Sequence, residues 1–182
     1  IAKLLLTLIT CLCTSAVSAQ SDINNDMFDL AKIKQGVKNK RISSTDPTGG
    51  NRDHLDPFKP GEKRVIADIK GAGIINHIWV TIAPAPPVLS RNDIILRMYW
   101  DGNDYPSVES PIGPFFGQGW DERYNFTSLP LSAGPDNGTG MSSYFTMPFE
   151  KGARIEIENQ SDRNIDAFYF YVDYLEMDKL PK

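Results

Sequence analysis

Cysteine and histidine are scarce in this sequence. The only cysteines, Cys11 and Cys13, lie in an apolar stretch near its start, so the residues that follow contain no thiol. Disulfides, cysteine nucleophiles and thiolate metal ligands are therefore excluded there. The only histidines are His54 and His77, and neither has the carboxylate–histidine spacing of a zinc site. We expect neither a metal nor a cofactor.

Motifs for phosphate and acyl chemistry are also missing. The stretch Gly113–Gly117 lacks the lysine and the following helix of a phosphate-binding loop. No Gly-x-Ser-x-Gly nucleophile motif occurs, and the turn at 101–104 is too short for a calcium loop. The 19 basic and 23 acidic residues give a net charge of −4. This balance argues against nucleic acid or an anionic membrane as partner.

Residues 1–19 have the pattern of an export signal. Lys3 is followed by an apolar run that is too short to span a bilayer, and small residues end at Ala19. No second run of membrane length follows. We expect a protein exported to the periplasm or the extracellular space, without membrane insertion after cleavage. A lipoprotein anchored through Cys11 is the less favoured alternative, because a threonine precedes that cysteine.

The remaining sequence predicts an all-β fold. Residues 20–42 read as a helical or linker segment, since apolar residues between Met27 and Ile33 fall at helical spacing. Residues 43–182 alternate as strands do. The expected strands are 63–69, 74–82, 93–100, 105–109, 126–131, 141–149, 153–158 and 167–175. Strands this short and this numerous favour an antiparallel jelly-roll β-sandwich with a short N-terminal helical segment.

The stretch Ser43–His54 is the most polar part of the chain. It contains hydroxyls, carboxylates, an amide, a guanidinium and an imidazole around Gly49-Gly50, with no large apolar side chain to bury. Asp46-Pro47 favours a turn, and the glycine pair allows close approach of the backbone to a ligand. The stretch is either a surface turn or a site that binds a polyhydroxylated ligand.

After these exclusions, the carboxylates and the aromatic residues are the side chains left that could serve a chemical function, and both are typical of carbohydrate-active proteins. Glycoside hydrolysis needs two carboxyl groups across the scissile bond. The candidates on loops are Asp46, Asp53, Glu109, Asp121 and Glu122, and the sequence gives no geometry to choose a pair.

The tryptophans divide by context. Trp79 and Trp120 could contact a sugar or another subunit, whereas Trp100 alternates as a core residue does. His77 shares a strand face with Trp79, and a core or interface histidine with a hydrogen-bonded ring is its ordinary interpretation. Three Asn-x-Ser/Thr sequons, at Asn125, Asn137 and Asn159, are interpreted as chance.

Several long motifs together resemble glycoside hydrolase family 172, formerly domain of unknown function 2961. The resemblance extends from about Ile33 to the end of the sequence. Its motifs, in order, are SSTDPTGGNRDH, ADIKGAGIINHIW, LRMYWDGNDYPSVESPIGPFFGQGW, MPFEKGARIEIENQSD and FYFYVDYLEMDKLP.

The resemblance implies an exported retaining exo-glycosidase acting on α-fructofuranosides or arabinofuranosides. Family members are two jelly rolls in tandem, assembled as trimers or larger oligomers. Their two catalytic glutamates lie in Gly-Glu-Gly-Asp and Gly-Thr-Glu-Asp-Tyr motifs of the second jelly roll, and this sequence contains neither motif. We therefore expect the N-terminal part of such an enzyme, inactive alone and without a catalytic residue. Pro114 stands where many relatives carry an aspartate.

The resemblance also implies a half-site for substrate. The expected substrate-binding residues are Thr48, Asn51, Arg52, Asp53, His54 and Trp79, and the expected ligand is a furanose-containing oligosaccharide or glycan. A homo-oligomer, a trimer or a multiple of one, would bring Phe115, Phe116 and Trp120 across an interface. The alternatives are a stand-alone carbohydrate-binding module without catalysis and an interaction domain whose strand at 168–174 forms a subunit contact.

Overall fold

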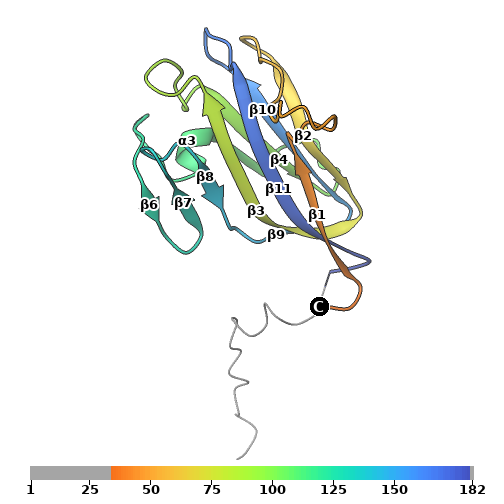
Figure 1. Cartoon of the computed structure of the whole chain (residues 1–182). Helices are drawn as coiled ribbons and strands as arrows, with labels where there is room; N and C mark the ends of the chain where they lie inside the picture. Colours follow the sequence, from red (N-terminus) through yellow and green to blue (C-terminus); the bar gives the residue numbers. More distant parts are fainter. Residues whose placement is uncertain (1–33, 181–182) are drawn as a thin grey trace, which may run out of the picture. The chain divides into compact units, whose positions relative to one another are not determined.

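Strands dominate the computed structural model, which describes residues 34–180 (Figure 1). The predicted export signal at 1–19 and the predicted helical spacing at 27–33 lie outside the described residues. The elements are β1 (Val37–Ser43), β2 (Lys63–Lys70), β3 (Ala72–Ala83), β4 (Ile94–Trp100), β5 (Val108–Pro111), α3 (Ile112–Phe115), β6 (Phe126–Thr127), β7 (Leu131–Ala133), β8 (Met141–Ser143), β9 (Met147–Phe149), β10 (Gly152–Asn159) and β11 (Ala167–Met177).

The strands form two antiparallel sheets, as the all-β prediction requires. The larger sheet has the order β1-β11-β3-β8-β7-β6, and β9 also pairs with β3. The smaller sheet has the order β2-β10-β4-β5. Figure 1 shows β1, β11 and β3 side by side, with β2, β10 and β4 behind them. The two sheets therefore form a β-sandwich.

One hydrophobic core lies between the sheets. Buried and half-buried residues alternate along β10, so that Ile155 and Ile157 are fully buried while Glu156 between them is half-buried. From the opposite sheet, Val80, Phe170 and Val172 pack into the same cluster. Side chains on a strand point alternately to its two faces. The inner residues of β3 and β11 thus fill the core, and their outer residues remain available for contacts outside it.

The larger sheet begins earlier in the sequence than predicted. Val37–Ser43 forms β1 and pairs with β11 from Met177 to Tyr171, so the helical pattern does not extend to Arg41 and the sheet starts six residues before the predicted boundary at 43. β1 is an edge strand that is mostly exposed. It carries lysines, which are typical of protected sheet edges, and this polar composition leaves almost no apolar alternation to detect.

Two predicted strands are interrupted, and one short helix was not predicted. The strand predicted at 141–149 is split into β8 and β9, which pair with successive parts of β3 on either side of a break at 144–146. The strand predicted at 126–131 divides into β6 and β7. The single turn α3 follows β5 directly. Within residues 34–180, no helix is long and apolar enough to cross a membrane.

Candidate functional site

The polar loop after β1 lines a groove. Residues of Ser43–Asp56 surround a volume of about 440 Å³, which lies within the range of small-molecule sites. The lining residues include the predicted Thr48, Arg52 and His54. The loop is held at both ends by backbone hydrogen bonds to β11, from Ser44 N to Phe170 O and from Leu55 N to Phe168 O. The sheet therefore fixes the position of the groove.

Asp46 organises the interior of the loop. Its carboxylate accepts hydrogen bonds from Thr48 N at 2.8 Å, Thr48 Oγ1 at 2.7 Å and Arg52 N at 3.2 Å. The hydrogen bonds from Thr48, followed by that from Arg52, lower the pKa of Asp46. An added Cβ at Gly50 would lie 2.9 Å from this carboxylate. Gly50 was predicted to allow close approach of the backbone to a ligand, and it instead makes room for the carboxylate of Asp46.

The predicted binding residues divide between structural and open positions. Asp53 Oδ1 accepts a hydrogen bond from Asp46 N at 2.8 Å, and Asp53 O accepts one from Ser44 Oγ at 2.7 Å. Asp53 therefore shapes the loop. Arg52 is exposed and pairs with Asp56 at 2.5 Å, while Asn51 is exposed in the left-handed conformation, with φ of 62°. Their side chains are accessible to a ligand.

The loop and Trp79 lie on the same face of the larger sheet. His54 packs edge-on against Tyr169, with ring centroids 5.4 Å apart, and Trp79 stacks on Tyr171 at 4.9 Å. Tyr169 and Tyr171 alternate on β11, so both point away from the core. The aromatic strand was predicted, but its register was not visible, since Trp79 and Tyr171 are paired across 92 positions of sequence. The structure thus brings His54 and Trp79 to one surface.

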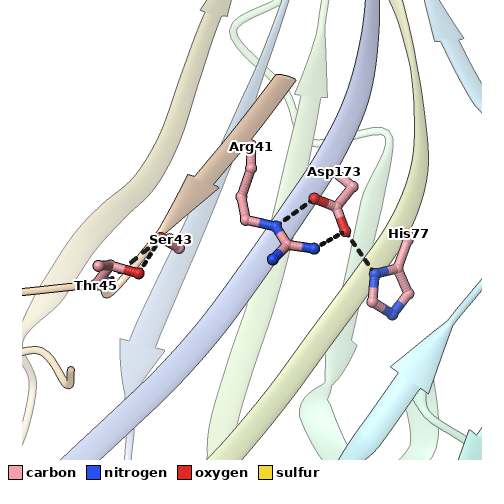
Figure 2. A network of polar contacts seen from close by, with 5 residues as sticks. All are labelled: Arg41, Ser43, Thr45, His77 and Asp173. Carbon is pink, nitrogen blue, oxygen red and sulfur yellow. Dashed lines mark hydrogen bonds and ion pairs between the residues drawn. The ribbon is translucent and has the colours of Figure 1, made fainter. Parts of the chain in front are cut away.

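A charged network continues this surface, and sequence reasoning missed two of its three members. Asp173 on β11 accepts hydrogen bonds from Arg41 Nε at 2.6 Å and Arg41 Nη2 at 2.9 Å, and lies 2.8 Å from His77 Nδ1 (Figure 2). These partners sit on neighbouring strands, where Asp173 faces both Arg41 and His77 in register. The hydrogen bond from Arg41 lowers the pKa of Asp173, burial opposes the shift, and His77 adds to it. His77 is therefore a hydrogen-bonded outer-face residue.

Phe115, Phe116 and Trp120 were predicted to lie across a subunit interface, and for Phe116 this prediction is wrong. Phe116 is fully buried in the core, because the single turn α3 directs its side chain inward. Trp120, by contrast, is 90% exposed in the left-handed conformation, and Phe115 is partly buried. Trp100 packs against the core, as expected.

A buried arginine supports the loop that carries Trp120. Arg91 donates to Gln118 Oε1, to Gly138 O at 3.0 Å and to Thr139 O at 3.1 Å, and its backbone N–H donates to Asp121 Oδ1. Burial lowers the pKa of Arg91 to about 10, assisted by the positive charge of Arg123. No spacing in the sequence signals this contact, because its partners lie 27 to 48 positions away.

Two of the other carboxylate candidates are engaged elsewhere, and Glu122 is exposed. Glu109 accepts a hydrogen bond from Arg97 at 2.6 Å on the smaller sheet, and Asp121 is bound to Arg91 N. Asp46 and Asp53 do lie together, but both accept backbone N–H bonds within the loop. In residues 34–180, no three His, Cys, Asp or Glu side chains gather closely enough to hold a metal ion.

A second groove of about 410 Å³ lies at the end of the smaller sheet, near Asp68, Tyr99, Asp101 and Arg154. Its main groups are already engaged. Arg154 lies over the Tyr99 ring at 4.0 Å, and Asp101 Oδ1 accepts backbone N–H bonds from the turn at 150–152. The polar groups of this groove therefore hold the turn at 150–152 in place, and the groove is a weaker candidate for a ligand site than the groove of Ser43–Asp56.

The chain is thus a two-sheet β-sandwich with a polar groove beside an aromatic sheet face. The sequence matches the GH172 domain-like family over residues 54–170, which is more than half of the chain. The chain belongs to this glycoside-hydrolase-related family. The match includes His54 and Trp79 and begins after Thr48, Asn51, Arg52 and Asp53. No curated protein matches the sequence.

Proposed function

We propose that this chain supplies the substrate-binding half-site of an exported retaining exo-glycosidase that acts on α-fructofuranosides or arabinofuranosides. The observation that carries the proposal is the groove of Ser43–Asp56, which opens beside an aromatic sheet face within a GH172 domain-like chain. Arg52 donates to sugar hydroxyls, Asn51 bridges neighbouring hydroxyls, and Trp79 forms an apolar wall. Thr48 and Asp53 keep the loop in shape.

The half-site holds no catalytic pair. The carboxylates of its loop accept backbone hydrogen bonds that keep them in place, and the two glutamate motifs of the family are not among these 182 residues. The chain alone is therefore expected to bind a furanoside without hydrolysing it. A carbohydrate-binding module without catalysis remains the second candidate, favoured by the same groove.

Three further features belong to this proposal. The strand orders β1-β11-β3-β8 and β2-β10-β4-β5 support a jelly roll, the eight-stranded double-sheet arrangement. The exposed Trp120 supports a homo-oligomer, a trimer or a multiple of one, because an aromatic side chain held on a fixed loop is a typical interface anchor. The leader pattern at residues 1–19 supports export.

Calorimetric titration of this chain tests the proposal. We expect binding of methyl α-arabinofuranoside or methyl α-fructofuranoside, weaker binding of a methyl glucopyranoside, and no product release. Arg52→Ala should weaken furanoside binding by about ten- to a hundredfold, since a hydrogen bond from a charged group is worth about 1.5–3 kcal/mol.

Arg163→Ala is the matched control. Its side chain is 62% exposed and pairs with a neighbouring aspartate at 3.8 Å, much as Arg52 is 65% exposed and pairs locally. Equal affinities of the wild-type chain and Arg52→Ala would refute the groove as the site. Equal affinities for furanoside and pyranoside would refute the substrate class.

A further inference from the structure

We propose that the outer face of the larger sheet extends the groove into a longer binding surface, on which His77 accepts a hydrogen bond from a hydroxyl of a second sugar residue. The proposal rests on the proposed function and deepens it, because it makes the preferred ligand an oligosaccharide. His77 would contact the part of the ligand that lies beyond the sugar held by the loop.

The first step is the continuity of the surface. Ser43 and Arg41 alternate on β1 and point to the same side, and Ser43 lines the groove. Figure 2 shows the hydrogen-bonded pair Ser43 and Thr45 beside the network of Arg41, Asp173 and His77. The charged network is thus the direct neighbour of the groove wall.

The second step is length. Along β11, His54 contacts Tyr169, Trp79 contacts Tyr171 and His77 contacts Asp173. Four residues of strand separate the first contact from the last, which is about 13 Å at a rise of roughly 3.3 Å per residue. A surface of this length is long enough for more than one sugar ring.

The third step is the irregular backbone around His77. The register between β3 and β11 shifts at Asp173/Tyr174, so that β3 carries one extra residue next to His77. On the other side of β3, the break between β8 and β9 places Tyr144 against the His77 ring, with centroids 5.0 Å apart. Bulges are enriched beside functional sites, where they redirect side chains. A bulge on one side of β3 and a strand break on its other side therefore both lie next to this one imidazole.

The fourth step is the hydrogen-bonding polarity of that imidazole. Arg41 binds both oxygens of Asp173 and favours its ionised form. An ionised carboxylate only accepts hydrogen bonds, so Nδ1 of His77 carries a proton, and whenever the ring is neutral its Nε2 is an acceptor. Figure 2 shows Nε2 pointing away from Asp173. Among the contacts within residues 34–180, only Nδ1 of this ring has a hydrogen-bond partner.

A purely structural role predicts something different. The side chain of Arg41 is 52% exposed, and ion pairs of this exposure contribute little to stability. Arg41 alone also satisfies both oxygens of Asp173. A structural account therefore gives His77 no reason to be a histidine, and its substitution would leave ligand binding unchanged.

The test compares an arabinofuranosyl disaccharide with methyl α-arabinofuranoside, using this chain in calorimetry. His77→Phe keeps a ring against Tyr144 and removes both nitrogens, whereas His77→Gln places an amide near the position of Nε2. We expect His77→Phe to lose about fivefold in disaccharide affinity, the worth of one neutral hydrogen bond, with unchanged affinity for the methyl furanoside. His77→Gln should recover part of the loss.

Nitrogen NMR of the His77 ring supplies a second readout that needs no ligand. The wild-type chain should show the tautomer protonated at Nδ1 above pH 7.5, and Asp173→Asn should reduce the population of that tautomer. Equal disaccharide affinity of His77→Phe and the wild type, or a wild-type ring protonated at Nε2, would overturn the proposal. If the wild-type chain binds neither saccharide, the proposed function fails as well; if it binds both and only the variant result is negative, this inference alone fails.

Discussion

At the residue scale, the candidate site depends on side chains that act on one another before they act on a ligand. Asp46 and Asp53 hold the loop through backbone hydrogen bonds, and Asp173 holds His77 against Tyr144. Because these contacts already order the loop, less conformational entropy of the loop is lost when a ligand binds. Arg52, which is exposed beside its partner Asp56, is the main group that we propose for recognition of the ligand.

Asp173 gives a pH-dependent prediction. Its folded-state pKa lies below the ordinary value of 3.8, so its stabilising contribution is present above about pH 4 and is lost as the pH falls through the folded-state value. We expect Asp173→Asn to lower the free energy of unfolding at pH 7 by about 0.5–1 kcal/mol. The difference between variant and wild type should shrink towards pH 2.5, as urea unfolding at both pH values will show.

Asp162→Asn is the control for this series, because the Asp162 side chain is 90% exposed and its ion pair with Arg163 is long, at 3.8 Å. It should follow the wild type at every pH. A constant gap between Asp173→Asn and the wild type from pH 7 to pH 2.5 would show that ionisation of Asp173 does not stabilise the fold.

At the scale of elements, β3 packs closely against both β11 and β9 at Gly73. A Cβ at Gly73 would lie 2.5 Å from Leu175 O and 2.6 Å from the ring of Phe149. Leu175 O belongs to a strand of the sheet and the Phe149 ring is packed in the core, so moving either atom would disturb the sheet or the core. The glycine therefore allows β3 to lie close to both neighbours, just before the bulge that presents His77.

We expect Gly73→Ala to cost about 1–3 kcal/mol, the usual range for overpacking a filled interior, and to lower the melting temperature by several degrees. Gly119→Ala is the matched control, since nothing lies within 4 Å of its added Cβ, and it should stay within about 0.5 kcal/mol of the wild type. Differential scanning calorimetry of the two variants decides the matter. Equal melting temperatures would contradict the packing at Gly73.

Sequence patterns predicted some elements well and others poorly, for physical reasons. β10 was found because a strand with one buried face alternates, as Ile155 and Ile157 do. β1 was missed because an edge strand with exposed residues has no such alternation. The break between β8 and β9 was missed because the aromatic residues Tyr144 and Phe145 continue a strand-like composition through it.

The candidate site was likewise predictable only in its local part. The turn at Asp46 and the polarity of the loop follow from residues a few positions apart. The association of Asp173 with His77 joins positions 96 residues apart, and that with Arg41 joins positions 132 apart. Strand register sets such contacts, and register depends on the whole sheet.

At the scale of the whole molecule, the sandwich separates two roles. The inner faces of both sheets form one core, and the outer face of the larger sheet carries the groove, the aromatic residues and the charged network. The smaller sheet's outer face carries ion pairs instead, in which Arg97 contacts Glu109, Glu156 and Glu158. The outer face of the larger sheet thus combines exposed polar groups, such as Arg52, with aromatic rings.

Chemical-shift mapping of this chain, titrated with an arabinofuranosyl oligosaccharide, tests most directly whether a furanoside binds to the outer face of the larger sheet, as we propose. We expect the largest amide shifts at residues 48–54, 77–79 and 169–173. Shifts confined to the groove near Asp68, Asp101 and Arg154, or no shifts at millimolar ligand, would contradict this proposal.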